Sequence, residues 1–202
     1  MENTLIIGAG VAGVNAATKL VDNNYKGNIT IIDMGNDPFN RKPEEVMTGF
    51  MGAGGWSDGK LTYHTSIGGH MSKYCGDEKA MELMDQVIDN FRRFHPKPEV
   101  IQCSHPVEEP EFIKPYFGLR LFPVWHIGTD YLHEIGKNWH DYLIEKGVEF
   151  IWETKVTDIN FDNNIVMYDG GWEDYDKLIF GVGKSGIDFA KSLSEDYELP
   201  TE

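Results

Sequence analysis

The pattern of apolar and polar positions predicts a strand, a helix and a second strand at the start of the chain. Residues 4–8 (TLIIG) and 28–33 (NITIID) are short, mainly apolar runs, which are typical of strands buried in a parallel sheet. Between these runs, apolar side chains recur at helical spacing, at Val11, Val14, Ala17 and Leu20. Asn23, Asn24 and Gly27 then supply a helix stop.

The middle of the chain is less regular. Residues 34–70 have weak periodicity and many glycines, with GFMGAGGWSDGK at 49–60 as their centre, and predict a functional loop. A helix is expected after Gly76, with a stripe of apolar residues at Met81, Met84, Val87, Ile88, Phe91 and Phe94. Residues 95–125 contain six prolines, so we expect irregular or edge-strand structure and an excursion from the core over about 62–125.

Regular structure returns in the last third. A helix is expected between Thr129 and Gly147, buried on the side that carries Leu132, Ile135, Trp139, Leu143 and Ile144. Strand-like runs at 148–153, 155–161 and 164–169 predict a small antiparallel β-meander, at about 148–170. KLIFGVGKSG at 177–186 predicts one more buried strand that runs into glycines, followed by a short helix. We expect residues 1–202 to form a single α/β domain, its parallel sheet built from 4–8, 28–33 and 177–182.

The charge and the cysteine content of the chain exclude some classes of partner and of chemistry. Thirty-three acidic against 18 basic residues give a formal charge of −15, which repels phosphate backbones and anionic lipids, so neither nucleic acid nor a membrane is an expected partner. An anionic ligand must therefore be held by local backbone N–H groups and a helix end. The chain has only two cysteines, far apart, which excludes disulfide-reductase chemistry and favours a cytoplasmic setting.

The sequence GAGVAG at 8–13 carries the main functional signal. It follows a strand, opens a helix and precedes a second strand that ends in an acid, which is the context of a dinucleotide-binding motif. Gly8 permits the tight turn, Gly10 lets the backbone approach a pyrophosphate, and Gly13 lets the helix pack on the strand. The expected contacts to the dinucleotide are Gly8, Gly10, Val11, Ala12 and Gly13, with Asp33 and Met34 at the adenosine ribose.

The identity of the dinucleotide is only partly set by this motif. Asp33 with no arginine directly after it disfavours a 2′-phosphate, so NADP is the poorest fit. FAD and NAD present the same ADP half to the fold, and the motif does not separate them. The place of the motif at the start of the chain favours FAD, because flavoproteins commonly begin there.

Four segments together resemble a family, the poorly characterised FAD-dependent dehydrogenases of the glutathione-reductase-like flavoprotein superfamily, which are NAD(P)/FAD-dependent oxidoreductases. They are GAGVAG at 8–13, GFMGAGGWSDGKL at 49–61, HIGTDYL at 126–132 and KLIFGVGKSG at 177–186. The resemblance implies a Rossmann-like FAD-binding domain with FAD as cofactor. It places Gly52, Gly54, Gly55, Ser57 and Lys60 near the flavin or pyrophosphate, and Lys155 and Val156 near the adenine. Gly181 and Gly183, in the last segment, are further expected cofactor contacts. The alternatives are a flexible surface loop for the first group and ordinary strand residues for Lys155 and Val156.

The chain also departs from that family. Its members are about twice this length, and many carry cysteines before the glycine-rich loop, where residues 39–47 here have none. We therefore expect a short or split version of the family, and a second polypeptide that completes the flavin site is a candidate partner. The seven histidines show no metal-binding spacing, so no metal is expected, and His126 is assigned to packing or capping.

The expected function is an FAD-binding, dehydrogenase-like oxidoreductase that acts on a small-molecule substrate or electron donor, with no catalytic side chain assigned. Two alternatives stay open. The chain could be a non-catalytic dinucleotide-binding or protein-interaction module, or one subunit of a two-chain flavoenzyme. Flavin binding by the isolated chain separates these possibilities, because a module that binds NAD or nothing would purify without colour.

Overall fold

The computed structural model describes residues 1–106, 111–112, 114–118 and 121–198. The chain divides into two compact units, the first formed by Met1–Trp56 and Gly136–Glu202 and the second by Ser57–Ile135. The strands are β1 Asn3–Ile7, β2 Asn28–Ile32, β3 Lys60–Thr62, β4 Gln102–Ser104, β5 Val124–His126, β6 Glu149–Ile151, β7 Val156–Asn160, β8 Ile165–Tyr168, β9 Gly171–Asp174 and β10 Lys177–Phe180. The α-helices are α1 Val11–Asp22, α2 Met71–Phe94, α3 Leu132–Glu145 and α4 Ile187–Asp196, with short 3-10 turns η1 Gly52–Gly55, η2 Pro98–Val100, η3 Thr129–Tyr131 and η4 Lys184–Gly186.

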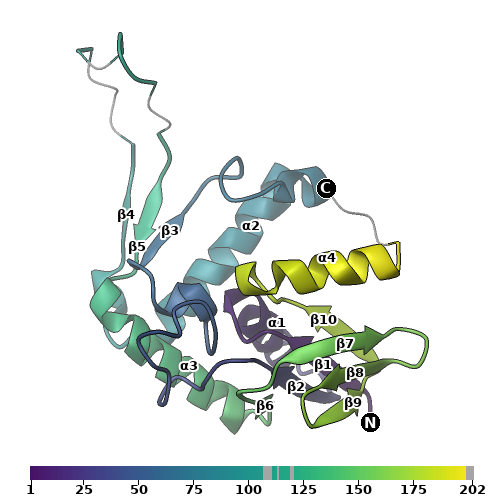
Figure 1. Cartoon of the computed structure of the whole chain (residues 1–202). Coiled ribbons are helices and arrows are strands. Elements are labelled where there is room, and N and C mark those ends of the chain that lie inside the picture. Colours follow the sequence, from purple (N-terminus) through teal and green to yellow (C-terminus); the bar gives the residue numbers. More distant parts are fainter. Residues whose placement is uncertain (107–110, 113, 119–120, 199–202) are drawn as a thin grey trace. The chain divides into compact units, whose positions relative to one another are not determined.

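The first unit is built on a parallel sheet of four strands in the order β10-β1-β2-β6 (Figure 1). Leu5 of β1 lies beside Leu178 on one side and Thr30 on the other. This arrangement confirms the α/β fold class and the three parallel strands expected from the apolar runs. The fourth strand, β6, differs from the expectation, because residues 149–151 pair with β2 and do not join the meander. An apolar run of three residues does not reveal which neighbour it pairs with.

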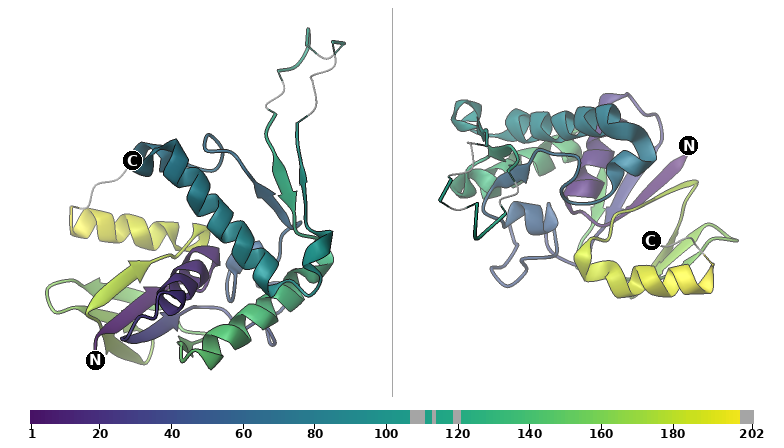
Figure 2. Two further views of the ribbon diagram at one scale, coloured as in Figure 1. Left: turned by 180° about the vertical axis from the view of Figure 1, so that it is seen from behind. Right: turned by 90° about the horizontal axis from the view of Figure 1, so that it is seen from above.

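The parallel sheet of this unit lies between two layers, the meander with α4 on one side and α1 on the other. Because side chains alternate along a strand, Leu5 and Ile7 face one side of the sheet and Ile6 the other. The first side packs against the meander and α4, in a cluster of Leu5, Ile7, Ile32, Val156, Ile159, Val166, Tyr175 and Leu193. α1 covers the second side (Figures 1 and 2). A Cβ on Gly13 of this helix would lie 3.1 Å from the side chain of Ile6. The indole of Trp139 in α3 donates a hydrogen bond to the hydroxyl of Thr18 in α1 (2.7 Å), so α3 also contacts this layer.

The antiparallel meander consists of β7, β8 and β9 and therefore lies later in the chain than expected. Val166 of β8 is the residue that pairs with both Ile159 of β7 and Glu173 of β9. Residues 171–174 (GWED) were not predicted as a strand, because one glycine and two acidic residues in four positions are typical of a turn.

The second unit contains the antiparallel sheet β3-β5-β4 and the helix α2. Trp125 at the centre of β5 lies opposite both Leu61 and Cys103. The guanidinium of Arg92 in α2 is 4.3 Å from the centre of the Trp125 ring, and this contact joins the helix to the sheet. The hydroxyl of Tyr63 donates to the carboxylate of Asp85 in α2 (2.7 Å), which adds a polar link.

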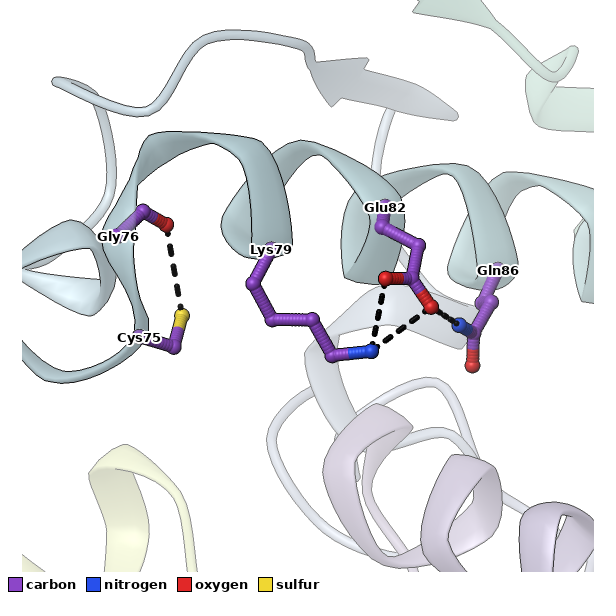
Figure 3. Close-up of polar contacts among 5 residues, drawn as sticks. All are labelled: Cys75, Gly76, Lys79, Glu82 and Gln86. Carbon is purple, nitrogen blue, oxygen red and sulfur yellow. Dashed lines mark hydrogen bonds and ion pairs between the residues drawn. The ribbon is translucent and has the colours of Figure 1, made fainter.

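Helix α2 is interrupted at Gly76, whose φ of 79° is not helical. The expected helix start after Gly76 thus coincides with the break, and one further turn precedes it. On the exposed side, Lys79 and Gln86 both bind the carboxylate of Glu82, while Cys75 lies against the Gly76 carbonyl (Figure 3). The buried residues of α2 are Ala80, Ile88, Phe91 and Phe94, which include three of the expected apolar stripe.

The apolar side of α3 was predicted correctly at four of its five positions. Leu132, Ile135, Trp139 and Leu143 are buried, whereas Ile144 is 48% exposed. Ile144 directly follows Leu143, so the helical rotation of one residue carries it off the buried side. Across the described residues, no helix is both long and apolar enough to cross a membrane.

Candidate functional site

A cavity of about 590 Å³ opens in the first unit where β1, β2 and β10 end. This is the edge at which open parallel sheets bind ligands. Twelve of the sequence-predicted contact residues line it: Gly8, Gly10, Val11, Ala12, Asp33, Met34, Gly52, Gly54, Lys155, Val156, Gly181 and Gly183. Segments that are far apart in the sequence therefore meet at one cavity.

Two glycines of the first motif shape the turn itself. Gly8 has a φ of +101°, and a Cβ there would lie 2.4 Å from the carbonyl oxygen of Gly181. A Cβ on Gly13 would lie 1.9 Å from the carbonyl oxygen of Gly8 and 3.1 Å from Ile6. Gly13 does not line the cavity; it allows α1 to approach β1, which is the packing role expected from the motif.

Gly10 differs from these two glycines. It is the N-cap residue of α1 in an extended conformation (φ −65°, ψ 178°), and a Cβ there would meet nothing within 4 Å. Its carbonyl accepts the first helical bond, from Val14 (3.0 Å). The N–H groups of the first residues of a helix lack partners inside it, and no described side chain caps this end. The start of α1 thus presents N–H donors and a positive dipole end beside open space in the cavity.

The carboxylate of Asp33 accepts three hydrogen bonds from backbone N–H groups, which the sequence did not predict. One oxygen accepts from the N–H of Ala9 (2.7 Å), and the other accepts from those of Gly35 (2.8 Å) and Gly49 (2.7 Å). A carboxylate has about four acceptor positions, so it retains capacity for one further donor. Asp33 lines the cavity, and its contact with a ribose stays a prediction. The structure gives this residue a second role, because its carboxylate joins the two glycine-rich segments.

Arg41, behind the glycine-rich loop, is a residue that the sequence did not indicate, as are several residues of the cavity wall. It is 9% exposed, and its guanidinium donates to the carbonyl oxygens of Glu45, Val46, Phe50 and Gly52 at 2.6 to 3.0 Å. Burial lowers the pKa of Arg41, while the negative charges of Asp33 and Glu45 act in the opposite direction. An arginine in a segment without periodicity gives no sequence signal, because its acceptors are backbone atoms of the segment itself.

The glycine-rich loop at 49–60 divides between the two units. A Cβ on Gly52 would lie 3.4 Å from the Cα of Gly10, and one on Gly54 would lie 2.3 Å from a methyl group of Val11. These two glycines bring the loop close to the start of α1. Gly55 packs against the Arg41 guanidinium and does not line the cavity.

Ser57 and Lys60 belong to the second unit and are not among the residues that line this cavity. The Ser57 hydroxyl accepts from the N–H of Gly59 (3.2 Å), and Lys60 pairs with Asp58 (2.9 Å). Their predicted contact with a cofactor stays a prediction.

Two of the family-like segments meet in the second unit. Ile127 donates its N–H to the carbonyl of Gly59 (2.7 Å), and the hydroxyl of Thr129 donates to that of Asp58 (2.9 Å). His126 lies on β5 with its Nε2 2.9 Å from the Ser104 hydroxyl.

The rest of the cavity wall combines apolar surface with two cations. Met34, Met47, Phe180, Val182 and Phe189 provide the apolar part. Lys155 and Lys184 also line it, and within the described part of the chain neither has an ion-pair partner. The acid of this wall besides Asp33 is Asp188, in the first turn of α4. The cavity therefore suits a ligand with an anionic centre and apolar rings.

No protein-family model and no curated protein matches the sequence. The fold is nevertheless similar to solved structures. Glycine oxidase from Geobacillus kaustophilus matches at 13% identity with a TM-score of 0.56, over 99% of this chain and 60% of that one. L-proline dehydrogenase from P. horikoshii matches at 13% identity and 0.53, over 100% and 57%. A flavoprotein/dehydrogenase from Cytophaga hutchinsonii matches at 17% identity and 0.52, over 99% and 42%.

At these identities the likeness establishes the fold. The chain spans about two fifths to three fifths of the length of these structures. Its fold is therefore the α/β architecture found in this group of oxidoreductases, as the sequence predicted.

Proposed function

We propose that the cavity binds a dinucleotide through its pyrophosphate, that the dinucleotide is FAD, and that the protein is an FAD-binding oxidoreductase. The observation that carries this proposal is the start of α1, where N–H donors without helical partners lie beside open space at Gly10. A helix N-terminus in this setting is an anion site. In a chain with a formal charge of −15, an anion needs such local donors.

The remaining cavity residues fit the other parts of a dinucleotide. Met34, Lys155 and Val156 would hold the adenosine, with the free acceptor position of Asp33 toward the ribose. Gly52 and Gly54 would let the loop approach the pyrophosphate beside the start of α1, and Gly181 and Gly183 would do so from the end of β10.

FAD is preferred to NAD for two reasons. The solved structures of this fold include a protein described as a flavoprotein/dehydrogenase, an oxidase and a second dehydrogenase. The segments at 49–61 and 126–132 resemble those of FAD-dependent dehydrogenases. A bound flavin would supply hydride or electron transfer, and the role of this chain's residues is to bind and orient it.

The absorption spectrum of the purified protein tests this proposal. We expect a yellow protein that releases FAD on denaturation, or a colourless protein that takes up added FAD in a 1:1 ratio. NAD binding without FAD binding would indicate a nicotinamide-binding module instead. A folded protein that binds neither ligand would refute the proposal.

A second proposal is that polypeptide outside this sequence, either a further part of the same protein or a partner chain, completes the flavin site. The chain covers 60% or less of each of the similar structures. Under this proposal FAD affinity or substrate turnover increases when that polypeptide is added. Turnover by the isolated chain at an ordinary enzymatic rate, of the order of 1 to 1,000 per second, would contradict it.

A further inference from the structure

The loop that closes the cavity contains a residue in a disfavoured conformation. Met51 has left-handed backbone angles (φ 63°, ψ −2°), which a residue with a Cβ seldom adopts, and it is only 1% exposed. It lies beside Gly10 as a parallel bridge partner, and its N–H donates to the carbonyl of Ala9 (2.7 Å). The surrounding structure must therefore hold Met51 in this conformation.

Arg41 supplies much of that restraint. Its guanidinium binds the carbonyls on either side of Met51, those of Phe50 (2.8 Å) and Gly52 (2.6 Å). The same group binds the carbonyls of Glu45 and Val46 at the start of the loop. The planar fork of an arginine reaches several acceptors at once, and the point charge of a lysine does not. One side chain thus ties both ends of the segment 45–52 together.

Asp33 holds the same loop through one N–H group, that of Gly49. Its carboxylate accepts from Gly49 within the loop and from Ala9 in the glycine-rich turn. The loop is thus anchored by a cation on four of its carbonyls and by an anion on one of its amides. The result is the close approach of Gly52 to Gly10, with Thr48, Met51 and Gly52 in the cavity wall.

We propose that Arg41 is a positioning residue for the dinucleotide. By binding the four carbonyls of the 45–52 loop it holds Met51 and Gly52 against the start of α1, in the arrangement that the pyrophosphate requires. The proposal rests on the proposed function and adds a residue that does not line the cavity itself.

Two variants of Arg41 and one control test this proposal. Arg41→Lys keeps the charge and loses the fork, and Arg41→Ala removes both. Arg92→Lys is the matched control, since Arg92 packs on Trp125 in the second unit. ADP affinity is measured by calorimetry at a temperature where circular dichroism shows each variant folded. Amide exchange at Met51 is measured without ligand.

We expect R41K and R41A to weaken ADP binding by about tenfold or more, the effect of one lost charged hydrogen bond, and R92K to leave it unchanged. Millimolar guanidinium should restore part of the ADP affinity of R41A. The same concentration of sodium should not restore it. The Met51 amide should exchange faster in R41K than in the wild type. Should R41A not fold, R41K and the exchange measurement decide alone.

ADP binding within twofold of wild type by folded R41K and R41A would overturn the proposal, as would equal exchange at Met51. A wild-type protein that binds neither ADP nor FAD would instead refute the proposed function. Exchange at Met51 would then still decide whether Arg41 holds the loop, because that measurement needs no ligand.

Discussion

Gly10 and Gly13 stand three residues apart in one motif, and the structure predicts opposite effects for side chains added at the two positions. A Cβ at Gly10 enters open space of the cavity, whereas a Cβ at Gly13 would meet the carbonyl oxygen of Gly8 at 1.9 Å. Gly10→Val should therefore impair binding without loss of stability. Gly13→Ala should destabilise the fold, although alanine ordinarily favours a helix.

The magnitudes follow from the two environments. A poor N-cap residue in place of glycine costs about 0.5 to 1.5 kcal/mol, and the lower entropy of the unfolded chain offsets about 0.4 to 1 kcal/mol of this. The net change for Gly10→Val is thus within about 1 kcal/mol, or about 4 °C in Tm at this chain length. For Gly13→Ala, overpacking costs about 1 to 3 kcal/mol or more against about 1 kcal/mol gained in helix propensity, so Tm should fall by several degrees.

The ligand affinities complete the prediction. Each charged hydrogen bond lost when the valine keeps the pyrophosphate from the N–H groups is worth about 1.5 to 3 kcal/mol, roughly ten- to a hundredfold in Kd. Thermal unfolding followed by circular dichroism and titration with FAD give both quantities for each variant. Wild-type FAD affinity in Gly10→Val, or a Tm loss in that variant as large as in Gly13→Ala, would refute the assignment of Gly10 to the ligand.

Three further predictions concern other parts of the molecule. Asp33→Ala should lower Tm as well as FAD affinity, since it leaves three backbone N–H groups without their acceptor. Each buried group left unpaired costs about 1 to 3 kcal/mol of stability. An unchanged Tm by calorimetry would contradict this prediction. ADP should bind the first unit's cavity and compete with FAD, whereas FMN, which lacks the ADP half, should not; displacement of FAD by FMN in a fluorescence titration would contradict the placement of the pyrophosphate. The hydrogen bond to Asp85 raises the pKa of Tyr63 from 10.0 to about 12, so it stabilises the fold below pH 10 and this contribution is lost between pH 10 and 12. The stability difference between wild type and Asp85→Asn, measured by urea unfolding, should accordingly be constant up to about pH 9 and shrink above pH 10, and a difference that grows with pH would contradict the assignment.

The start of the fold was predictable from sequence because its determinants are local. The apolar runs at 4–8 and 28–33 and the glycines between them specify the strand, turn and helix by their own composition. Strand β6 was assigned to the wrong sheet because pairing partners are set by tertiary contacts, which a short run does not encode. Strand β9 was missed because glycine and acidic residues are depleted in strands.

In the candidate site, too, locally determined features were predictable and those set by tertiary contacts were not. Gly8 and Gly10 were identified from the spacing of the first motif, whereas Gly52 and Gly54 were expected only through the resemblance to a family. Arg41 was missed because its partners are carbonyl oxygens, which every residue carries, and its burial depends on how the 41–55 loop folds back. The three bonds of Asp33 were equally hidden, although the residue itself was identified, because its donors come from three separate turns.

The amide resonances of Gly10, Val11 and Ala12 in ¹⁵N-labelled protein, followed during a titration with ADP, test the central claim most directly. The account predicts that these three resonances shift together and saturate at one equivalent of ADP, because their N–H groups bind the pyrophosphate. Resonances of the second unit's sheet, such as that of Trp125, serve as the internal reference. Saturable ADP binding that leaves Gly10, Val11 and Ala12 unmoved, or no ADP binding by the folded protein, would contradict it.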